Sequence, residues 1–449
     1  MAEQADSILG KNIQQTDWVS RLSTILLCAM MLFSIVSVPD FNRTASVAAS
    51  TDHVNPINRF VWLGLLSMAL PLIRARWAQI LRLIKASWLL IGLFLYFTCS
   101  TVWALDPAIS TRRIMFAWIE IILAVTLTCT MKDRKYLLKF IFISCLVAAV
   151  ADLIVWILMP GYAMTSEGLA GIQSQKNQTG LIMMYGLLAG APLLLYRPPK
   201  RERYRILAGM GLLFLLLLAS RSKTCLGIIM VMPVLVVLFF KLTHSRMSLS
   251  VAIVTSISAI FICIVFGYFI WCEITNVSPF ALFQDMTFTS RTDLWSFMFQ
   301  EIQKRPWFGA GFYSFWSIDP SVQPSLKTSM WFGSEAHINE AHDGYLDLLA
   351  TGGAVGFIWG LSVIIRTFTL ALEALGRAGR PDPARPTVLS YPLACFHVSF
   401  LCALCIHNFT ESNLFCNNGM LAVALYFTIF DLEDWEENDD QPLSQSGLA

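Results

Sequence analysis

The motifs SRTDLW (residues 290–295), RPWFGAG (305–311) and EAHDGY (340–345) mark one long polar and aromatic-rich stretch, residues 273–343. The chain on both sides of this stretch consists almost entirely of apolar runs. A helix that spans a bilayer needs about 20 mostly apolar residues, so this stretch is too polar to lie within a membrane. We therefore expect a long loop outside the membrane, and any chemistry of the protein is expected to involve it.

The composition is that of an integral membrane protein. Of the 449 residues, 56% are hydrophobic and only 14% are charged, whereas soluble domains carry about a quarter charged residues. The net charge of +2 gives no electrostatic footprint for nucleic acid, so no such partner is expected. The 11 cysteines are scattered and are interpreted as small core residues. Residues 1–18 lack a basic segment and a cleavage site, so the first apolar run is expected to be a retained helix.

Twelve apolar runs are candidates for membrane-spanning helices. The loops between them alternate between a basic set and a set with few basic residues, which indicates that the basic set faces the cytoplasm. Twelve spans then place both termini in the cytoplasm and the long loop in the periplasm. The expected spans are 19–38, 57–73, 87–104, 114–130, 137–158, 179–196, 206–220, 223–240, 249–272, 344–366, 390–407 and 412–430.

The sequence divides into four parts. Residues 1–272 carry the first nine spans, residues 273–343 form a periplasmic loop with short helices, and residues 344–430 carry the last three spans. Residues 431–449 are acidic and are expected to form a disordered cytoplasmic tail, because like charges repel and bury nothing. No repeat relates the two halves, which argues against a transporter built from repeated halves.

Two arginines on the outer face are candidates for binding an anion. Arg221 lies in SRSKT (220–224), a hairpin with almost no loop between two apolar runs. A charge this close to the membrane is costly unless it is paired or exposed to water, so Arg221 is either an interfacial cation or a fixed anion site. Arg291 follows two good N-cap residues in an expected amphipathic helix. A cation in the first turn opposes the helix dipole, which suggests an anionic partner; the alternative is an exposed surface arginine.

His342 is the candidate general base, because histidine can accept or donate a proton near neutral pH. Its alternative is a structural hydrogen bond at a helix start. The spacing to His337 and the nearby glutamates does not match a metalloenzyme motif, so no metal site is expected. Aromatic residues around Trp307 fit an interfacial belt or a sugar-stacking wall equally well. Lys176 and His407 are weaker candidates, each compatible with an ordinary loop.

The outer-face candidates are far apart in the sequence, yet the expected topology brings them to one membrane surface. Two arginines and a histidine there suit a lipid-linked diphosphate. Guanidinium groups pair with phosphate oxygens and can stabilise a leaving diphosphate. The histidine could deprotonate a sugar hydroxyl that attacks the anomeric carbon. The residues are Lys176, Arg221, Arg291, His342 and His407.

Five motifs together resemble a known family. They are the loop from Gly171 to Lys176-Asn177, SRSKT, SRTDLW, RPWFGAG and the run AHDGYL (341–346). In this set the chain resembles the O-antigen ligase and polysaccharide polymerase superfamily (WaaL and Wzy-type proteins). SRSKT and the Lys-Asn pair look closest to ExoQ-like exopolysaccharide polymerases. The resemblance covers roughly residues 170–365, and residues 1–165 match only in hydropathy.

The resemblance implies a metal-independent, inverting glycosyltransferase of the GT-C type that needs no cofactor. Its donor would be a glycan on undecaprenyl diphosphate at the periplasmic face of the bacterial inner membrane. It implies that Arg221, Arg291 and Lys176 bind the diphosphate and that His342 is the catalytic base or positions the acceptor. Further possible contacts with acceptor or sugar are His337, Tyr345, Trp307 and His407.

The expected function is that of a polymerase, which joins lipid-linked repeat units into a longer polysaccharide. The acceptor would be a second lipid-linked repeat unit, and a separate chain-length regulator is a possible partner. One alternative is an O-antigen ligase that transfers the same donor glycan to lipid A-core; the ExoQ-like features favour the polymerase. Another alternative is a flippase or other transporter, which twelve spans would fit but the long outer loop does not favour.

Overall fold

The computed structural model describes residues 2–36, 56–244, 271, 286–330, 332–333, 338–379, 389–415 and 419–439. The prediction of an all-α integral membrane protein is confirmed. A short antiparallel hairpin, β1 (Met164–Thr165) and β2 (Gly168–Leu169), and one 3-10 helix, η2 (Pro324–Lys327), lie between the helices. The helices are α1 (Ala2–Val36), α2 (Pro56–Ala75), α3 (Trp77–Ala86), α4 (Trp88–Ser100), α5 (Pro107–Thr130), α6 (Lys135–Leu158), α7 (Pro160–Ala163), α8 (Lys176–Leu195), α9 (Lys200–Ser220), α10 (Lys223–His244), α13 (Met286–Lys304), α14 (Gly344–Ala378), α15 (Tyr391–His407) and α16 (Met420–Asp439).

Most predicted spans have a helix at the expected place. Within the described residues, 8 helices are long and apolar enough to cross a membrane, or up to 9 if α3 and α4 are one span broken by an 84° bend. α15 is a shorter apolar helix. The predicted span 249–272 lies, apart from residue 271, outside the described residues. The count of twelve and the sidedness of the protein therefore stay predictions.

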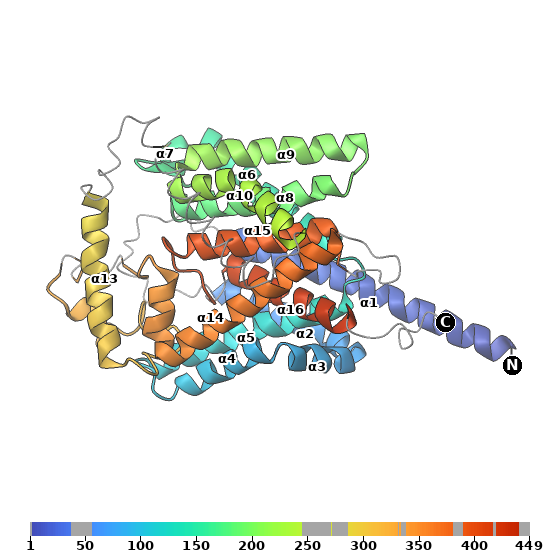
Figure 1. Ribbon diagram of the computed structural model, residues 1–449, viewed down its shortest axis with the longest axis horizontal. Helices are drawn as coiled ribbons and strands as arrows, with labels where there is room; N and C mark the ends of the chain where they lie inside the picture. The colour runs from blue at the N-terminus through green and yellow to red at the C-terminus, as the bar shows by residue number, and fades with distance from the viewer. Residues whose placement is uncertain are drawn as a thin grey trace.

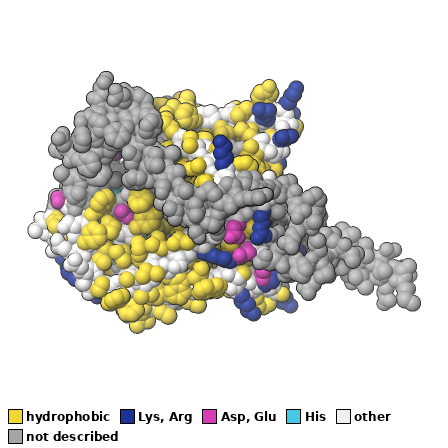
Figure 2. Space-filling view, in the orientation of Figure 1, with side chains coloured by type: hydrophobic (Ala, Val, Ile, Leu, Met, Phe, Trp, Pro, Cys, Tyr) yellow, Lys and Arg dark blue, Asp and Glu magenta, His cyan; other side chains and the backbone are white. Residues whose placement is uncertain are grey.

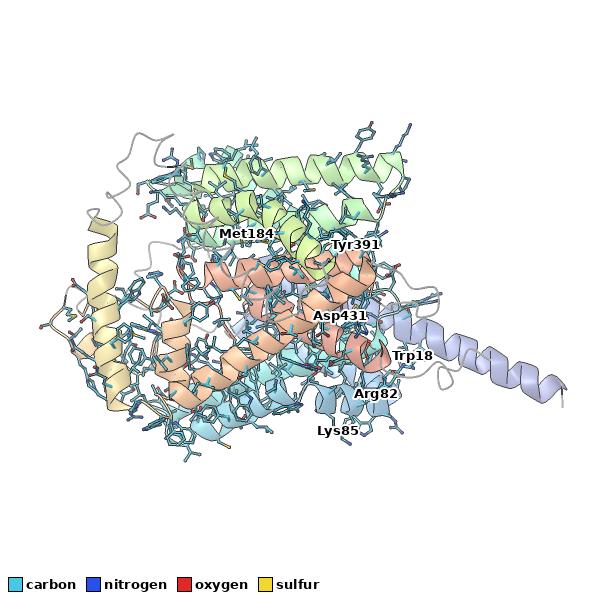
Figure 3. All side chains as sticks on the ribbon, viewed as in Figure 1. Trp18, Arg82, Lys85, Met184, Tyr391 and Asp431 are labelled. Atoms are coloured by element: carbon cyan, nitrogen blue, oxygen red, sulfur yellow. The ribbon has the colours of Figure 1, made fainter. Side chains whose placement is uncertain are left out.

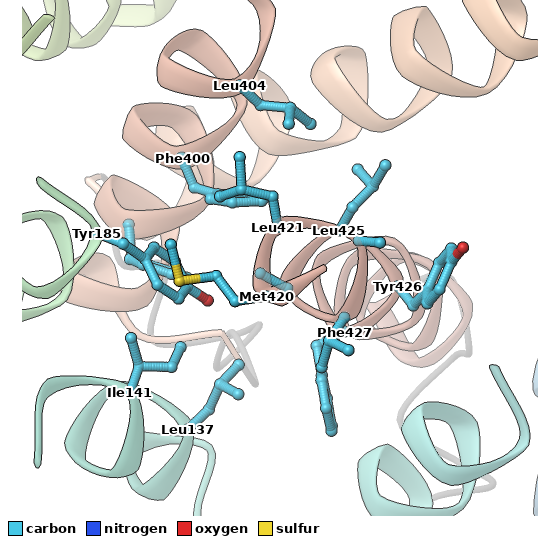
Figure 4. Close-up of a cluster of buried hydrophobic side chains, with 14 of the residues drawn as sticks. Leu137, Ile141, Tyr185, Phe400, Leu404, Met420, Leu421, Leu425, Tyr426 and Phe427 are labelled. Atoms are coloured by element: carbon cyan, nitrogen blue, oxygen red, sulfur yellow. The ribbon is translucent and has the colours of Figure 1, made fainter. Parts of the chain in front are cut away.

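The long helices run side by side, and α13 stands across one end of the bundle, at the left in Figure 1. α8 lies deep inside the bundle, with most of its apolar residues buried, and packs against α6, α9 and α15. α16 is also enclosed: Figure 4 shows Met420 and Leu421 among Phe400 of α15, Tyr185 of α8 and Ile141 of α6. In a membrane such burial separates helices that contact protein from helices that contact lipid.

The RPWFGAG segment fills a break in α14. Gly353 interrupts that helix with a φ of 60°. Segment 306–311 and residues 350–355 of α14 exchange four backbone hydrogen bonds of 2.8–3.2 Å across the break. A Cβ atom on Gly353 would collide with the backbone of Trp307 and Phe308, and one on Gly309 would collide with α14. The glycine pattern of this motif is therefore explained by close backbone approach.

The same loop is bound to the N-terminal end of α5. Asp106 caps α5 by accepting a hydrogen bond from Ile109 N at 3.0 Å, and it also accepts one from Asp319 N at 3.3 Å. Arg113 donates to the carbonyl oxygens of Trp316 and Ser317, both at 2.9 Å, and to that of Tyr313. The described part of the loop therefore packs on the bundle rather than standing apart as a domain.

The acidic C-terminal segment corrects one prediction. Residues Asp431–Asp439 continue α16 as a helix rather than forming a disordered tail, and residues 440–449 lie outside the described part of the chain. Basic side chains from three other segments neutralise this end of α16, so its charges do not force it apart. The contacts are Arg134 with Asp431 and Asp434, Arg366 with Glu433 and Glu436, Arg82 with Glu437, and Arg377 over the ring of Trp435.

These charges gather at the end of the bundle opposite α13. Figure 2 shows dark-blue and magenta side chains toward the right, beyond the broad hydrophobic surface. Arg82, Lys85 and Asp431 all lie toward that end in Figure 3. We call the set of arginine contacts with the acidic half of α16 the α16 clamp.

Candidate active site

The start of α14 holds His342 in an unusual backbone conformation. Asp343 is the N-cap of α14, and its Oδ1 accepts hydrogen bonds from Tyr345 N (2.9 Å) and Leu346 N (3.0 Å). His342 has a φ of 51°, in the left-handed region that non-glycine residues rarely occupy. Gly344 N donates to Asn408 O at 2.8 Å, which joins this corner to the end of α15. The cap and this contact fix where the imidazole stands.

His342 lies between two carboxylates. Its Nδ1 is 3.0 Å from Glu340 Oε1 and 3.5 Å from Glu411 Oε2, the latter from the turn between α15 and α16. The interaction with Glu340, followed by that with Glu411, raises the pKa of His342 to about 9. The imidazole is therefore protonated at neutral pH. We call Glu340, His342 and Glu411 the His342 cluster.

The two glutamates of the cluster differ in proton affinity. Burial raises the pKa of Glu340 above its ordinary value, and the hydrogen bond with His342 only partly offsets this. For Glu411 burial acts in the same direction, but the hydrogen bonds with His342 and Glu340 outweigh it and lower the pKa. The pKa of Glu411 therefore lies below that of Glu340, which makes Glu340 the stronger base of the two.

The N-terminus of α8 joins the cluster through Asn177. Asn177 Nδ2 donates to Glu411 Oε1 at 2.7 Å. The neighbouring Lys176 pairs with Glu167 in the β1–β2 hairpin, with Nζ 3.0 Å from Oε2. Lys176 thus lies one residue from a direct contact with the cluster.

Arg221 lies beside the same hairpin. It ends α9 in a left-handed conformation, with φ 54° and ψ 25°, and its side chain is exposed. A Cβ atom on Gly168 would meet the Ser220 backbone and the Arg221 Cβ, so only glycine permits this approach. Among the residues that the structure describes, the Arg221 side chain has no ion-pair partner, which leaves its guanidinium available to a ligand.

Arg291 lies on α13, and its side chain is outside the described part of the structure. Trp295 follows it by four residues, so the two positions share one helix face. Trp295 Nε1 donates to Ala341 O at 3.1 Å, directly before His342. The helix that carries Arg291 is therefore bound to the His342 segment.

The buried carboxylate of Asp347 supports the His342 cluster through hydrogen bonds to its neighbours. Asp347 accepts hydrogen bonds from Trp316 Nε1 at 2.6 Å and from Ala341 N at 2.9 Å, and it also contacts the Ser412 hydroxyl. Ala341 and Ser412 directly neighbour His342 and Glu411. Asp347 therefore fixes both sides of the cluster and the long loop at once.

The remaining predicted contacts have different surroundings. Tyr345 donates from its hydroxyl to Cys405 O at 3.0 Å, and its ring packs on Phe409. His407 is buried, with Nδ1 3.2 Å from Asn413 Nδ2. Trp307 is 66% exposed beside the break in α14. His337 lies outside the described residues. A role of these four residues in binding acceptor or sugar stays a prediction.

The sequence alone does not single out four residues of this site, which are Glu340, Glu411, Asn177 and Asp347. The signal for Glu411 was a single acidic residue in a short turn between two apolar helices. Such a carboxylate needs a partner near the membrane surface. Which partner it takes depends on the fold, because His342 is far away in the sequence.

The His342 cluster is also the place where a metal ion could bind. One ligand atom from each of its three residues lies within 4.8 Å of the others. A metal would need the imidazole as a neutral ligand. Both carboxylates instead approach the same Nδ1 and favour its proton. The contacts therefore fit a proton-sharing cluster better than a metal cage.

Two comparisons with known proteins bear on the family of this chain. No curated protein matches the chain. Residues 206–359 match the family model described as O-antigen ligase, a segment that carries Arg221, Arg291 and His342. The match covers about a third of the chain and does not extend to the ExoQ-like subtype. The resemblance to the O-antigen ligase and Wzy superfamily that the motifs indicate is thereby confirmed for this part of the chain.

Proposed function

We propose that this protein is a polysaccharide polymerase of the bacterial inner membrane. It transfers a glycan from undecaprenyl diphosphate to a lipid-linked repeat unit on the periplasmic face. The observation that carries the proposal is the contact path from Arg221 to α13. It runs through the β1–β2 hairpin, the N-terminus of α8 and the His342 cluster to Trp295.

The donor end of this path is cationic. Arg221, Arg291 and Lys176 hold the diphosphate of the donor lipid, and they need no metal because guanidinium and ammonium groups supply the positive charge. When the bond between the anomeric carbon and the diphosphate oxygen breaks, its electron pair goes to the diphosphate. The cations stabilise that developing charge.

The acceptor end of this path is the His342 cluster. The acceptor hydroxyl oxygen forms its new bond to the anomeric carbon from the face opposite the diphosphate, which inverts the configuration. Glu340 takes the hydroxyl proton, since burial raises its pKa and makes it the stronger base. His342, already protonated by its neighbours, acts as a cation that orients the hydroxyl and the leaving diphosphate.

The test is transfer by the purified protein in detergent, where no two compartments exist. Lipid-linked repeat units incubated with the protein and EDTA are expected to give a ladder of longer lipid-linked glycans. Arg221→Ala, Arg291→Ala and His342→Ala are each expected to lower the rate by at least about 100-fold. Lys304→Ala, an exposed cation on α13, is the control and should retain full activity.

Two outcomes would contradict this proposal. A folded wild-type protein that gives no ladder would remove the polymerase function, and a strict metal requirement would remove the mechanism. Activity within a few-fold of wild type in one arginine or histidine variant would exclude that residue alone.

A ligase is the second candidate, because the matching family model is described as O-antigen ligase. It would use the same donor and transfer the finished glycan to lipid A-core. Deleting the gene and separating surface glycans on a gel distinguishes the two. A lost polymerase leaves single repeat units, whereas a lost ligase leaves long chains on undecaprenyl diphosphate.

A further inference from the structure

Glu411 contacts two segments that both belong to the site. One carboxylate oxygen, Oε1, accepts the hydrogen bond from Asn177 at the N-terminus of α8. The other, Oε2, faces His342 Nδ1 at 3.5 Å, at the start of α14. Its side chain is only 13% exposed, so these partners replace water around a charged group.

The turn that carries Glu411 is itself held rigidly. Asn413 N donates to Asn408 Oδ1 at 2.8 Å, and Glu411 N donates to His407 O at 3.1 Å. The next residue after Glu411, Ser412, contacts Asp347 through its hydroxyl. A carboxylate held in this way can fix the position of the start of α14 relative to the N-terminus of α8.

We propose that Glu411 is a positioning residue that sets the place of His342 relative to the N-terminus of α8 through its bridge to Asn177. The inference rests on the proposed function for its activity readout. Lys176, next to Asn177, belongs to the donor end, and His342 belongs to the acceptor end. Glu411 therefore keeps the diphosphate and the acceptor hydroxyl in register.

Only a carboxylate can make both contacts. Oε1 of Glu411 accepts a hydrogen bond from the Asn177 amide, while Oε2 lies 3.5 Å from Nδ1 of the protonated imidazole and forms an ion pair with it. A glutamine has one acceptor and one donor end, so Glu411→Gln leaves two donors facing each other on one side. Asn177→Asp places two carboxylates together instead. The double variant that combines Asn177→Asp with Glu411→Gln restores an amide–carboxylate hydrogen bond and leaves the glutamine oxygen for His342.

The experiment is a double-mutant cycle on the rate of glycan transfer with Asn177→Asp and Glu411→Gln. Each single variant is expected to lose at least about ten-fold in kcat, with the KM for donor changed little. The double variant should be at least about ten-fold more active than the product of the single effects predicts. Glu301→Gln, which removes a salt bridge to Lys304 on the surface of α13, is the matched control.

A pH profile separates positioning from mere stability. The charged groups that face His342 are Glu340 from its own segment and Glu411 from the α15 end, and Glu411 in turn interacts with Asn177 of α8 and with His407. Loss of the Glu411 charge should lower the pKa of His342 by about 1 pH unit or more and move the alkaline limit of activity to lower pH by the same amount. A structural role alone would leave this limit in place.

The melting temperatures of the same four proteins test the contact between Asn177 and Glu411 independently of any glycan transfer. Coupled melting temperatures in a wild-type protein that transfers no glycan would overturn the proposed function and keep the bridge. Additive effects in both rate and melting temperature would overturn the inference. Coupling in melting temperature alone, with independent effects on kcat and an unmoved pH profile, would reduce Glu411 to a structural residue.

Discussion

His342 receives its charge from its neighbours rather than from its own chemistry. An isolated histidine loses its proton near pH 6.5, whereas the two flanking carboxylates keep this one protonated up to about pH 9. Because the folded pKa is raised, the protonated form is present below that pH and is lost as the pH rises through it. The role of His342 can therefore be read from the direction of the pH dependence.

We predict that the rate of glycan transfer is steady between about pH 7 and pH 8 and falls as the pH passes about 9. The physical reason is that the proposed mechanism needs the imidazolium. Initial rates at saturating donor, with His342→Gln as the reference, provide the measurement. A rate that instead climbs with pH up to about 9 would assign the base role to the neutral imidazole.

Residue types could be predicted from the sequence, but their partners could not. Arg221 and His342 stood out because charged and titratable groups are rare in this apolar chain. Glu411 shares no sequence motif with His342, and only the packing of α15 against α14 brings the two together. The charge of a histidine depends on such partners, so the sequence alone does not tell whether His342 serves as a base or as a cation.

At the scale of elements, the path of α14 depends on two adjacent glycines, Gly352 and Gly353. The break at Gly353 allows the RPWFGAG segment to bond directly to the helix backbone, and Tyr96 of α4 donates to Gly352 O at 2.6 Å. The backbone contacts of the RPWFGAG segment attach the long loop to α14 at a second place, separate from the His342 cluster. The apolar run predicts a span over 344–366, whereas α14 continues to Ala378. The break, which a distant segment fills, leaves no signal in the periodicity.

We predict that Gly353→Ala destabilises the protein strongly. Its φ of 60° disfavours any side chain by about 1–3 kcal/mol, and the added Cβ would also collide with backbone atoms of Trp307 and Phe308. Melting temperature in detergent is the measurement, and a fall of many degrees is expected. Gly64→Ala in α2 is the control, since its Cβ would meet no atom within 4 Å. Equal melting temperatures for the two variants would contradict this account of the break.

At the scale of the whole molecule, three basic segments within the described residues meet at one end of the bundle. Arg82, Arg134 and Arg366 come from three separate basic segments, and all reach the acidic half of α16. Described segments of the predicted outer loops, from the β1–β2 hairpin to the α15–α16 turn, lie at the opposite end with the His342 cluster. The contacts of these segments are consistent with basic and non-basic loops lying at opposite ends of the bundle. Which end faces the cytoplasm stays a prediction.

The α16 clamp allows stability and activity to be separated, because it lies at the end remote from the His342 cluster. Asp431 is buried between Arg134 and His397, whose Nε2 is 2.7 Å from Asp431 Oδ2. Arg134→Met leaves that carboxylate without its cation, which costs about 3–5 kcal/mol for a buried pair. Arg82→Met, in a pair that is 41% exposed on the arginine side, should cost at most about 1 kcal/mol.

We therefore predict that Arg134→Met lowers the melting temperature far more than Arg82→Met does. Adding Asp431→Asn to Arg134→Met should recover part of the loss, because the buried charge is then removed together with its partner. The rate per folded molecule should stay near that of wild type in all three proteins, since no site residue is touched. If Arg134→Met is as stable as Arg82→Met, the clamp does not hold α16. If the stable fraction of Arg134→Met has lost transfer, the two ends of the bundle are coupled and the site extends further than the contacts around His342.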